Sequence, residues 1–452
     1  MLYRKIRSYI DAHLRSNEDK ILLIEGARQI GKSYIIRDVG TELYDNYVEI
    51  NFVEDDAGDK IFRNVRTTEE FYLNLSMVAG FKLDKYENTL VFIDEIQHYP
   101  QFLTMLKFLR QEHRYRFICS GSLLGIALKK TVSVPVGSII PKKMYQLDFE
   151  EFLIANDFGE DAIVHLRKSF EQKQPLAPEV HDKVLSLFKR YLLVGGMPDA
   201  VNEYLNSHNI VKVREAQESI RELYGVDASR YEEDAAKKLY IRRIYDMIPS
   251  QMENKKKRIV AKDILDRKGD RFSNYMEEFE YLINSGITIA SNAISNPKYP
   301  LAESQQKNLL KLYMNDVGML SSQLYHYNIQ PILNDIASIN LGSVYESAVA
   351  QELKAHYEKL FYYDNKQKGE VDFLVDDSDT MSVLPIEVKS GKDYTVHSAL
   401  DNLMAIQDYH IVSSIVLSNE REIKTKGNVL YLPIYYVMFL ENKMPVKENL
   451  YF

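Results

Sequence analysis

The spacing of hydrophobic positions changes along this chain of 452 residues. Up to about residue 150, short continuous apolar runs alternate with helical patterns, and the clearest runs lie at 21–24, 48–52, 89–93 and 116–119. Continuous apolar runs are typical of buried parallel strands, and their alternation with helices predicts a mostly parallel α/β sheet covered on both faces. From about 150 to 250, tyrosines and leucines recur at three- and four-residue spacing, which predicts helices.

The N-terminal residues predict an amphipathic helix. Leu2, Ile6, Ile10 and Leu14 repeat every four residues with basic residues between them. This spacing places the apolar side chains on one helix face, so we expect the helix to dock on the following domain. The N-terminus lacks the apolar core of a signal peptide. No run approaches the roughly 18 apolar residues of a membrane span, so no membrane segment is expected.

Residues 26–33 read GARQIGKS and directly follow the apolar run at 21–24. Gly26 and Gly31 let the backbone curve so that successive N–H groups point at one anion. Lys32 can then reach the β- and γ-phosphates, and the Ser33 hydroxyl can bind Mg²⁺ at the positive end of the next helix. This strand, turn and helix predict a phosphate-binding loop with ATP and Mg²⁺ as cofactors. The residues expected to bind the nucleotide are Gly26, Ala27, Arg28, Gln29, Ile30, Gly31, Lys32, Ser33 and Asp94.

The apolar run at 89–93 ends in two acids, Asp94 and Glu95. The carboxyl ends of parallel strands present ligand groups, so Asp94 is expected to hold Mg²⁺ through water beside Ser33. Glu95 is expected to polarise the attacking water as the general base. An apolar strand ending in Asp-Glu is a weak signal alone, but about sixty residues after a phosphate loop it becomes a strong one.

A third strand at 116–119 runs into Ser120, Gly121 and Ser122. In P-loop ATPases a polar residue at this strand end senses the γ-phosphate or the attacking water. We expect Ser120 to take this catalytic role, with Ser122 as the alternative, and a plain Ser-Gly turn is the competing interpretation. The run at 48–52 fits between the phosphate loop and the Asp-Glu strand.

Composition narrows the class of protein. Hydrophobic residues make up 45% and charged residues 27% of the chain, which is typical of a soluble globular protein of roughly two to four domains. The net charge of −8 gives no global positive field for nucleic acid, although a local basic face remains open. The single cysteine, Cys119, is expected in the core, which fits a reducing, cytoplasmic location.

A second group of chemistry-bearing residues lies near the C-terminus. The expected elements are a helix at 342–357 and strands at 361–363, 370–375 and 383–389. Residues i and i+2 of a strand share a face, so Glu387 and Lys389 project together. Asp372, on a neighbouring strand, completes a two-carboxylate Mg²⁺ site, to which Glu346 adds a third ligand. This arrangement resembles that of the PD-(D/E)xK nuclease fold, and the resemblance implies that Lys389 would support the nucleophile or the transition state of phosphodiester cleavage.

Two interpretations of this group stay open. Acids and a lysine that share a buried face need a metal or mutual pairing, because unpaired burial costs several kcal/mol. The group is therefore either a competent metal nuclease site or a salt-bridged relic with a fold-only or binding role.

The order of five motifs resembles one group of proteins. The motifs are GARQIGKS (26–33), VFIDEIQ (91–97), CSGS (119–122), YQLDFEEF (145–152) and GGMP (195–198). Together they resemble bacterial and archaeal AAA-like P-loop ATPases that carry an uncharacterised C-terminal module related to restriction endonucleases. The acid followed by Glu-x-Lys resembles the PD-(D/E)xK nuclease fold. The resemblance covers nearly the whole chain and implies a P-loop NTPase parallel-sheet domain, a helical lid over the nucleotide and a restriction-endonuclease-like α/β domain.

One feature of that group is missing. Many members carry a Gly-Arg pair ahead of the LDFEEF-like segment, whereas this chain reads VGS at 136–138. No arginine finger can therefore be assigned there. Candidate substitutes are Arg28, Arg114 and Arg116, and the sequence does not choose between them.

Residues 259–320 predict a helix, a turn, a second helix and a strand, an order that resembles a winged helix. The exposed positions of the second helix are expected to include Asn274, Glu277, Glu278 and Glu280. A DNA-reading helix would present basic residues to the major groove, so these acids favour a protein–protein or interdomain role. The charged segment 253–258 (ENKKKR) is expected to be a solvated linker.

The expected organisation has five segments. They are a P-loop ATPase core (1–150), a helical lid (151–255), a winged helix (256–330), a nuclease-like domain (331–447) and an engineered scar (448–452), since ENLYF resembles the start of a protease-cleavage site.

The leading functional hypothesis is an ATP-hydrolysing, Mg²⁺-dependent AAA-like ATPase coupled to a C-terminal nuclease-like domain that acts on DNA or RNA. The alternative is an ATP-dependent signalling or interaction switch with a catalytically silent C-terminal domain and a protein partner on the winged helix. Nothing in the sequence resembles the acceptor site of a small-substrate kinase. Ring formation is open, because AAA-like ATPases often share arginine fingers between copies.

Overall fold

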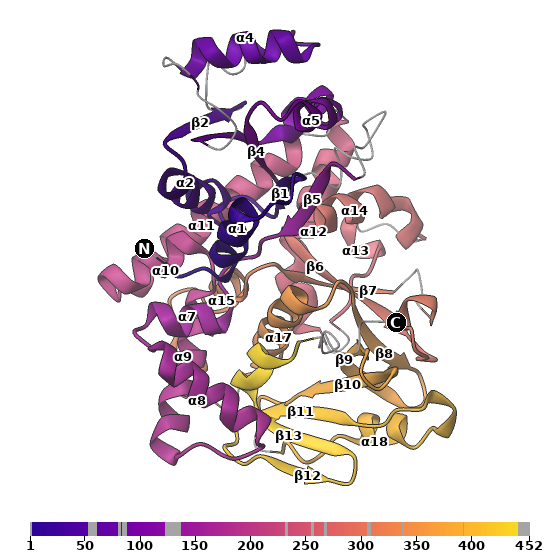
Figure 1. The fold of residues 1–452 in the computed structure, drawn as a ribbon. Coiled ribbons are helices and arrows are strands. Elements are labelled where there is room, and N and C mark those ends of the chain that lie inside the picture. The colour runs from indigo at the N-terminus through magenta and orange to yellow at the C-terminus, as the bar shows by residue number, and fades with distance from the viewer. Residues whose placement is uncertain are drawn as a thin grey trace. The chain divides into compact units, whose positions relative to one another are not determined.

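The computed structural model divides into two compact units (Figure 1). The first consists chiefly of residues Tyr3–Gln146 with Asn284–Ile287, and the second of Leu147–Ile283 and Thr288–Phe452. The residues that the structure describes are 2–52, 61–79, 83, 88–122, 137–230, 234–254, 257–265, 269–304, 309–336, 339–391 and 393–441. The expected scar at 448–452 and Val136 lie outside these described residues.

The first unit contains a five-stranded parallel sheet. Its strands are β1 (Ile21–Glu25), β2 (Asn46–Asn51), β3 (Thr89–Asp94), β4 (Arg116–Gly121) and β5 (Ile139–Lys143), in the spatial order β2-β3-β4-β1-β5. The predicted parallel α/β sheet is therefore confirmed. Strands β1, β3 and β4 are almost continuously buried, as the apolar runs predict for strands covered on both faces.

The place of β2 in the sheet differs from its place along the chain. β2 lies at the edge beside β3, and it is β4 that separates the phosphate-loop strand β1 from the Asp-Glu strand β3. The carboxyl ends of β1, β3 and β4 therefore lie next to one another at one edge of the sheet, which is where parallel sheets present ligand-binding groups.

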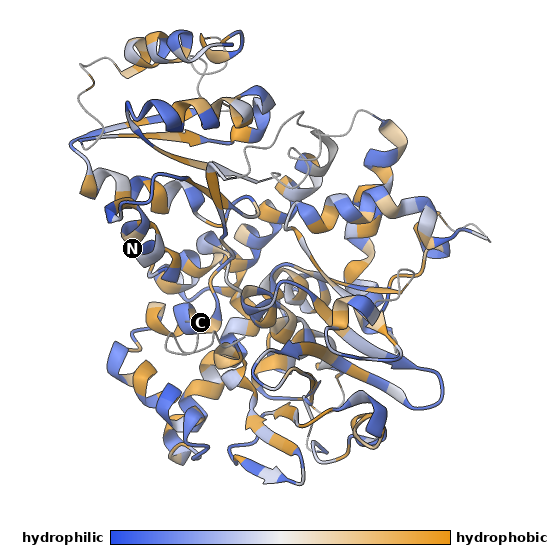
Figure 2. Cartoon of the chain, turned by 45° about the vertical axis from the view of Figure 1, so that its right-hand side comes forward, coloured by the Kyte–Doolittle hydropathy of each residue, from blue (hydrophilic) through white to orange (hydrophobic). Residues whose placement is uncertain are grey.

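The helices of the first unit each bury one face. They are α1 (Lys5–Arg15), α2 (Lys32–Leu43), α4 (Thr68–Ala79) and α5 (Pro100–Glu112). The predicted N-terminal amphipathic helix forms as α1, which contacts α2 and buries Ile10 and Leu14. Phe71 of α4 and Phe102 of α5 meet in the core with 5.8 Å between their ring centroids. In Figure 2 these helices carry both orange and blue residues, as expected for elements with one apolar face.

The second unit begins with six helices, which confirms the helical pattern between about 150 and 250. They are α7 (Phe149–Ala155), α8 (Glu160–Glu171), α9 (Pro178–Val194), α10 (Pro198–Ser207), α11 (Ile210–Arg230) and α12 (Ala235–Glu253). Further helices are α13 (Lys262–Leu265), α14 (Met276–Asn284), α15 (Val317–Tyr325), α16 (Gln330–Leu333), α17 (Gly342–His356) and α18 (Ser398–Met404).

The Gly-Gly pair of the GGMP motif permits a close approach between helices. A Cβ on Gly195 would lie 2.1 Å from an Asp316 carboxylate oxygen, and one on Gly196 would lie 2.0 Å from the Leu147 carbonyl oxygen. The buried Asp316 carboxylate accepts hydrogen bonds from the backbone N–H groups of Gly196 at 2.6 Å and Met319 at 3.1 Å. The GGMP motif is therefore bonded to the start of α15.

An eight-stranded mixed sheet fills the rest of the second unit. Its strands are β6 (Thr288–Ile294), β7 (Leu310–Met314), β8 (Leu360–Asn365), β9 (Gly369–Asp377), β10 (Ser382–Val388), β11 (Ser414–Ser418), β12 (Lys424–Lys426) and β13 (Val429–Pro433). Their spatial order is β12-β13-β11-β10-β9-β8-β6-β7. One sheet thus contains strands from both sides of residue 330, where a domain boundary is expected. The winged-helix and nuclease-like assignments, and that boundary, stay predictions.

Two local expectations for this region are wrong. Glu278 is buried at 4% exposure on α14, whereas the helical pattern places it at the surface. The charged linker also does not remain solvated throughout, because Lys257 and Arg258 form ion pairs with Glu346 and Asp364. Its neighbours Lys255 and Lys256 lie outside the described residues.

None of the described helices combines the length and the apolar character that crossing a lipid bilayer requires.

Candidate functional site

The predicted phosphate loop connects the end of β1 to the start of α2. Gly31 precedes the first turn of α2 with φ of 90°, a left-handed conformation that favours glycine. Gly26 is required for a different reason, because a Cβ there would lie 2.3 Å from the Met144 carbonyl oxygen. Gly31 is therefore favoured by its backbone conformation, and Gly26 by the lack of space for a side chain.

Lys32 points into this turn. Its ammonium donates hydrogen bonds to the carbonyl oxygens of Gly26 at 3.0 Å and Ala27 at 2.7 Å, and the side chain is almost fully buried. Burial lowers the pKa of Lys32, while the nearby Glu95 and Asp94 carboxylates oppose that shift. A buried ammonium bonded to uncharged carbonyls is a strong candidate to bind an anion.

Arg4, which the sequence analysis does not predict for the site, is hydrogen-bonded to the backbone of the phosphate loop. Its guanidinium donates to the carbonyl oxygens of Ile30 at 2.8 Å and Tyr145 at 2.5 Å. Ile30 belongs to the phosphate loop and Tyr145 follows β5, so one side chain joins two segments beside the candidate site. The sequence offers no signal for this contact, which links residues more than a hundred positions apart.

Asp94 accepts hydrogen bonds from several polar side chains at the carboxyl ends of the strands. Its Oδ2 accepts a hydrogen bond from the Ser33 hydroxyl at 2.6 Å, and its Oδ1 accepts bonds from the Ser120 hydroxyl and, at 3.0 Å, from the Glu95 N–H. Asn51, at the end of β2, also approaches Oδ2 at 3.4 Å. Burial raises the pKa of Asp94, and the two serine hydroxyls oppose that shift. A serine hydroxyl and a carboxylate oxygen at this distance are hard oxygen ligands of the kind that suits Mg²⁺.

Glu95 is oriented by a separate set of donors. Its backbone adopts a left-handed conformation with φ of 51°, and its Oε2 accepts hydrogen bonds from Gln97 and, at 3.1 Å, from Ser122. The Arg28 guanidinium lies 3.9 Å from the same oxygen. Burial opposes ionisation, but Lys32, Arg28 and the two hydrogen bonds together lower the pKa of Glu95. Glu95 is therefore held as a carboxylate, the form that a general base requires.

The two candidate serines occupy different positions in this arrangement. Ser120 bonds to Asp94, whereas Ser122 bonds to Glu95 and also receives a hydrogen bond from Gln97 at 3.2 Å. Gln97 is not among the residues that the sequence analysis predicts for the site. The signal that could have found it is its place two residues after Glu95, in the same VFIDEIQ motif.

Removing a donor to Glu95 should change the pH dependence of hydrolysis. A hydrogen bond to the charged form lowers a carboxyl pKa, so Gln97→Leu or Ser122→Ala should raise the pKa of Glu95. The acid limb of the kcat–pH profile should then move to higher pH by about one unit. Ser122→Thr retains the hydroxyl, and Gln101→Leu on α5 makes a matched change away from Glu95, so both should leave the limb in place. An unshifted limb in both test variants would mean that these donors do not act on the base.

The candidate arginines differ in their surroundings. Arg28 lies beside Glu95, as described above. Arg114 stacks over the Tyr72 ring at 4.5 Å, and Arg116 donates to the His13 carbonyl oxygen at 2.8 Å. Arg114 and Arg116 thus have structural contacts within the first unit, whereas Arg28 lies among the candidate catalytic residues.

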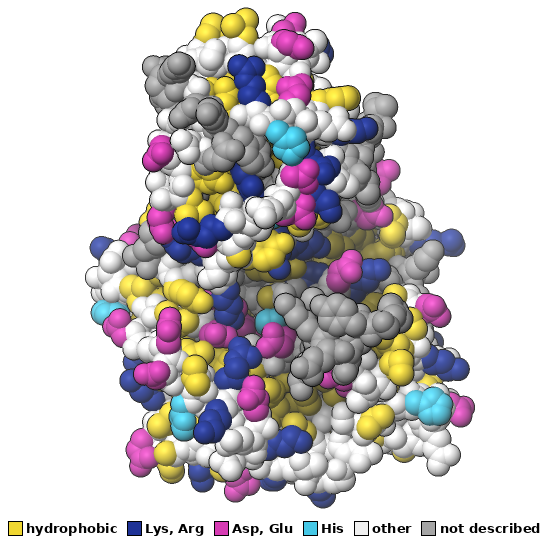
Figure 3. Space-filling view, in the orientation of Figure 1, with side chains coloured by type: hydrophobic (Ala, Val, Ile, Leu, Met, Phe, Trp, Pro, Cys, Tyr) yellow, Lys and Arg dark blue, Asp and Glu magenta, His cyan; other side chains and the backbone are white. Residues whose placement is uncertain are grey.

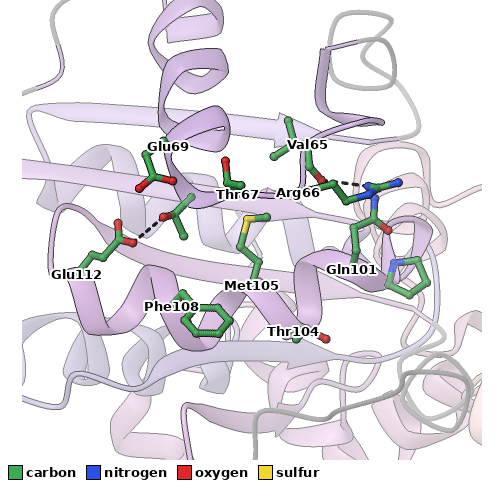
Figure 4. A pocket seen from close by; sticks show the side chains of 11 residues that line it. Val65, Arg66, Thr67, Glu69, Gln101, Thr104, Met105, Phe108 and Glu112 are labelled. Carbon is green, nitrogen blue, oxygen red and sulfur yellow. Dashed lines mark hydrogen bonds between the residues drawn. The ribbon is translucent and has the colours of Figure 1, made fainter.

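A groove between α4 and α5 shares no residue with the phosphate loop (Figure 4). It measures about 620 Å³, and its lining residues include Val65, Arg66, Gln101, Met105 and Phe108. The Thr68 hydroxyl donates to Glu112 at 2.6 Å across it. The groove carries none of the predicted nucleotide-binding residues.

The C-terminal candidates lie together in the second unit. Glu346 projects from α17, Asp372 from β9 and Glu387 from β10, and Lys389 follows β10. β9 and β10 pair in an antiparallel register with Ile386 opposite Phe373, which places Asp372 beside Glu387. Lys389 Nζ lies 2.8 Å from Glu387 Oε1, and the Val388 N–H donates to Asp372 at 2.8 Å. The structure therefore brings the four predicted residues together.

Two lysines that the sequence interpretation missed enter the same group. Lys257 Nζ lies 2.5 Å from Glu346 Oε2, and Lys311 Nζ on β7 lies 3.0 Å from Glu346 Oε1. Lys311 also contacts Glu370 at 2.6 Å, and Tyr313 donates to Glu346 Oε1 at 2.6 Å. We call Lys257, Lys311, Glu346, Glu370, Asp372, Glu387 and Lys389 the ionic cluster.

The neighbouring charges shift the pKa values of two acids of the ionic cluster in opposite directions. Although burial acts in the opposite direction, Lys257 and Lys311 lower the pKa of Glu346 to about 2. Burial, Glu387 and Glu346 raise the pKa of Asp372. Within the described part of the chain, no three His, Cys, Asp or Glu side chains are arranged to hold a metal ion. The metal-ligand role of Glu346, Asp372 and Glu387 therefore stays a prediction.

Lys311 should be a large contributor to the stability of the second unit. It is fully buried between Glu346 and Glu370, so Lys311→Met leaves two buried carboxylates without their shared cation. Losing one partner of a buried ion pair costs about 3–5 kcal/mol. We expect the free energy of unfolding, measured by urea denaturation, to fall by about that amount. Lys298→Met at an exposed position serves as the control, and a loss as small as the control's would contradict the prediction.

Comparisons with known proteins agree with the geometry of the first unit. Residues 18–153 match the family described as an AAA domain. Residues 185–327 and 341–437 match two families, each described as a domain of unknown function (DUF8612 and DUF4143). The N-terminal part of the chain is thus an AAA-like P-loop ATPase domain with a parallel α/β sheet.

Several solved structures are similar to the chain at low identity. The Walker-type ATPase PABY2304 of Pyrococcus abyssi is 15% identical over 71% of this chain and 95% of its own, with a TM-score of 0.42. The Aeropyrum pernix ORC1 protein, solved in complex with DNA, is 13% identical over 75% of this chain and 93% of its own, with a TM-score of 0.34. AMPPCP-bound DnaA from Aquifex aeolicus is 11% identical over 63% of this chain and 89% of its own, with a TM-score of 0.29. No curated protein matches the sequence.

Proposed function

We propose that this protein binds ATP with Mg²⁺ at the phosphate loop and hydrolyses it. The observation that carries the proposal is the bonded set at the sheet edge. Ser33 and Ser120 both donate to Asp94, and Glu95 stands beside them as a carboxylate with a lowered pKa. A phosphate loop without such a carboxylate could bind a nucleotide, but it would lack a base for the attacking water.

Each residue has one task in this proposal. Lys32 and the N-terminus of α2 bind the phosphates, and the Ser33 hydroxyl with the Asp94 carboxylate would hold Mg²⁺, which neutralises phosphate charge when bound. Glu95 orients the attacking water and accepts its proton. Ser120 positions Asp94, because its hydroxyl is bonded to the carboxylate oxygen that Ser33 leaves free.

Phosphate release by the purified full chain tests the proposal. We expect turnover of ATP in Mg²⁺ and its loss in excess EDTA. Equal turnover in Mg²⁺ and EDTA, or failure to bind ATP with Mg²⁺ present, would overturn it.

For the second unit we favour an ATP-dependent switch without cleavage chemistry. The observation in favour is the ionic cluster, in which Glu346, Glu370 and Glu387 are each paired with a lysine of this chain. In such a switch the nucleotide state would change contacts made by the second unit, with a protein partner at residues 259–320. A ring or other oligomer is compatible with it. The buried Cys119 fits a reducing compartment, and we propose the cytoplasm.

Nuclease action on DNA or RNA is the second candidate, favoured by the placement of Asp372 beside Glu387 and Lys389. Basic and acidic side chains are intermingled on the face that Figure 3 shows, which gives no single-sign surface for phosphate backbones there. Incubation with single- and double-stranded DNA and RNA in Mg²⁺ or Mn²⁺, with and without ATP, separates the candidates. Cleavage that is lost in Asp372→Ala and Lys389→Ala supports the nuclease. Intact substrates with ATP turnover present support the switch.

A further inference from the structure

We propose that Lys257 and Lys311 are the resident cations of the ionic cluster, and that the cluster holds no divalent metal while Lys257 is in place. The cluster would then be an ionic junction within the second unit. It would join the segment around Lys257 and strand β7 to helix α17 and strands β9 and β10. This inference goes beyond ATP hydrolysis and does not depend on it.

The first argument is the coordination of Glu346. Both of its carboxylate oxygens are engaged, Oε2 by Lys257 at 2.5 Å and Oε1 by Lys311 at 3.0 Å and the Tyr313 hydroxyl at 2.6 Å. Glu346 is buried at 1% exposure, so its lone pairs point to these donors rather than to bulk water. A divalent ion on Glu346 would have to displace at least one ammonium from hydrogen-bond distance.

The second argument is the charge of the cluster. Its acids are Glu346, Glu370, Asp372 and Glu387, and its cations are Lys257, Lys311 and Lys389. With every group ionised, four negative and three positive charges leave a net charge of −1. A divalent cation would change this to +1 in a buried site, where like charges repel strongly. Lysines therefore supply most of the counter-charge that a metal would supply.

The third argument is where the cations come from. Lys257 follows α12 and Lys311 lies on β7, both outside the 331–447 region from which the metal site was predicted. Both lysines lie in the segment that matches at 185–327. Glu346, Asp372 and Glu387 lie in the segment that matches at 341–437. The cluster thus bonds two family segments whose strands already share one sheet. Losing Lys257 or Lys311 would break that bond as well as the charge balance.

Glu387 Oε2 is the oxygen that a metal ion would bind if Lys257 were absent. Glu387 Oε2 is buried and receives no hydrogen bond from the described residues. It lies on the strand beside Asp372, and loss of Lys257 would free Glu346 Oε2. Glu346 Oε2 and Glu387 Oε2 would then lie beside Asp372 without a hydrogen-bond donor from the described residues, at a net cluster charge of −2, which is a better match to Mg²⁺ or Mn²⁺.

Binding of Mn²⁺ to the full-length, nucleotide-free protein tests the proposal by electron paramagnetic resonance. The parent protein and Asp372→Asn should bind equal amounts of Mn²⁺, because the cluster contributes no site in either. Lys257→Met should gain one site, and the double variant Lys257→Met with Asp372→Asn should lose it again. Lys262→Met, at an exposed position nearby, is the matched control and should behave as the parent protein does.

Two results would overturn the proposal. One is an additional Mn²⁺ site in the parent protein that Asp372→Asn removes. The other is a folded Lys257→Met variant that gains no site. Should Lys257→Met fail to fold, the amounts of Mn²⁺ bound by the parent protein, Asp372→Asn and Glu387→Gln still test the proposal. Equal amounts support it, and a site that either substitution removes would overturn it. ATP turnover in the same samples reports separately on the proposed hydrolysis, since none of these residues belongs to the first unit.

Discussion

Glu95→Gln should bind ATP with nearly unchanged affinity and hydrolyse it about 10²–10⁴-fold more slowly. The amide has the shape of the carboxylate but cannot take the proton of the attacking water. Because the donors Gln97 and Ser122 converge on one oxygen, the carbonyl oxygen of the amide can keep both hydrogen bonds and hold the side chain in place. Single-turnover phosphate release measures the chemical step, and titration with a fluorescent ATP analogue measures binding.

A matched substitution separates the role of the base from a general loss of negative charge. Glu69→Gln, at an exposed position on α4, makes the same chemical change away from the loop and should leave both quantities unchanged. A fall in kcat of less than about tenfold in Glu95→Gln would show that another group activates the water. Loss of ATP binding in the same variant would show that Glu95 is needed for the architecture of the site.

The proposed nucleotide site is largely predictable from the sequence because its residues are set by local rules. A continuous apolar run fixes a buried strand, and the carboxyl ends of parallel strands converge at one edge. Ser33, Asp94 and Ser120 could therefore be expected together, and the structure bonds them to one another. The spacing does not predict that Ser120 bonds to Asp94 and Ser122 to Glu95, because this choice depends on the rotamers and donors around each carboxylate.

Long-range contacts were the part that the sequence could not supply. Arg4 reaches Tyr145, and Lys257 reaches Glu346, across 141 and 89 positions of the chain. A basic residue at the surface and one in the core look alike in sequence until the fold brings a carboxylate or a carbonyl to it. For the same reason the charges of segment 253–258 predict a solvated linker, although Lys257 and Arg258 are ion-paired.

The C-terminal segment shows that a correct set of residues does not fix their chemistry. The motif predicts Glu346, Asp372, Glu387 and Lys389 as a set, and they do lie together. What decides between a metal site and an ion-paired junction is the counter-charge, which comes from Lys257 and Lys311 in segments that the motif does not include. A fold can therefore keep the residues of an active site while the surrounding cations change their role.

Lys32→Ala should weaken ATP binding by at least about 100-fold, equivalent to about 2.7 kcal/mol. The ammonium is now bonded to the uncharged carbonyl oxygens of Gly26 and Ala27, and burial lowers its pKa. A phosphate anion stabilises the charged form of a buried lysine more than a carbonyl oxygen does, so binding ATP should be coupled to full protonation of Lys32. Alanine removes that charge and leaves the phosphate facing backbone donors alone.

Titration of the variant with a fluorescent ATP analogue measures the loss, and Lys107→Ala on the exposed side of α5 is the matched control. Lys32 also bonds its own loop, so thermal unfolding without nucleotide must show that the first unit of Lys32→Ala still folds. A folded Lys32→Ala protein that binds ATP as tightly as the parent protein would remove the basis for placing the phosphates in this loop. A loss confined to Lys32→Ala would place them there, because only that lysine reaches the carbonyl oxygens of the turn among the residues that the structure describes.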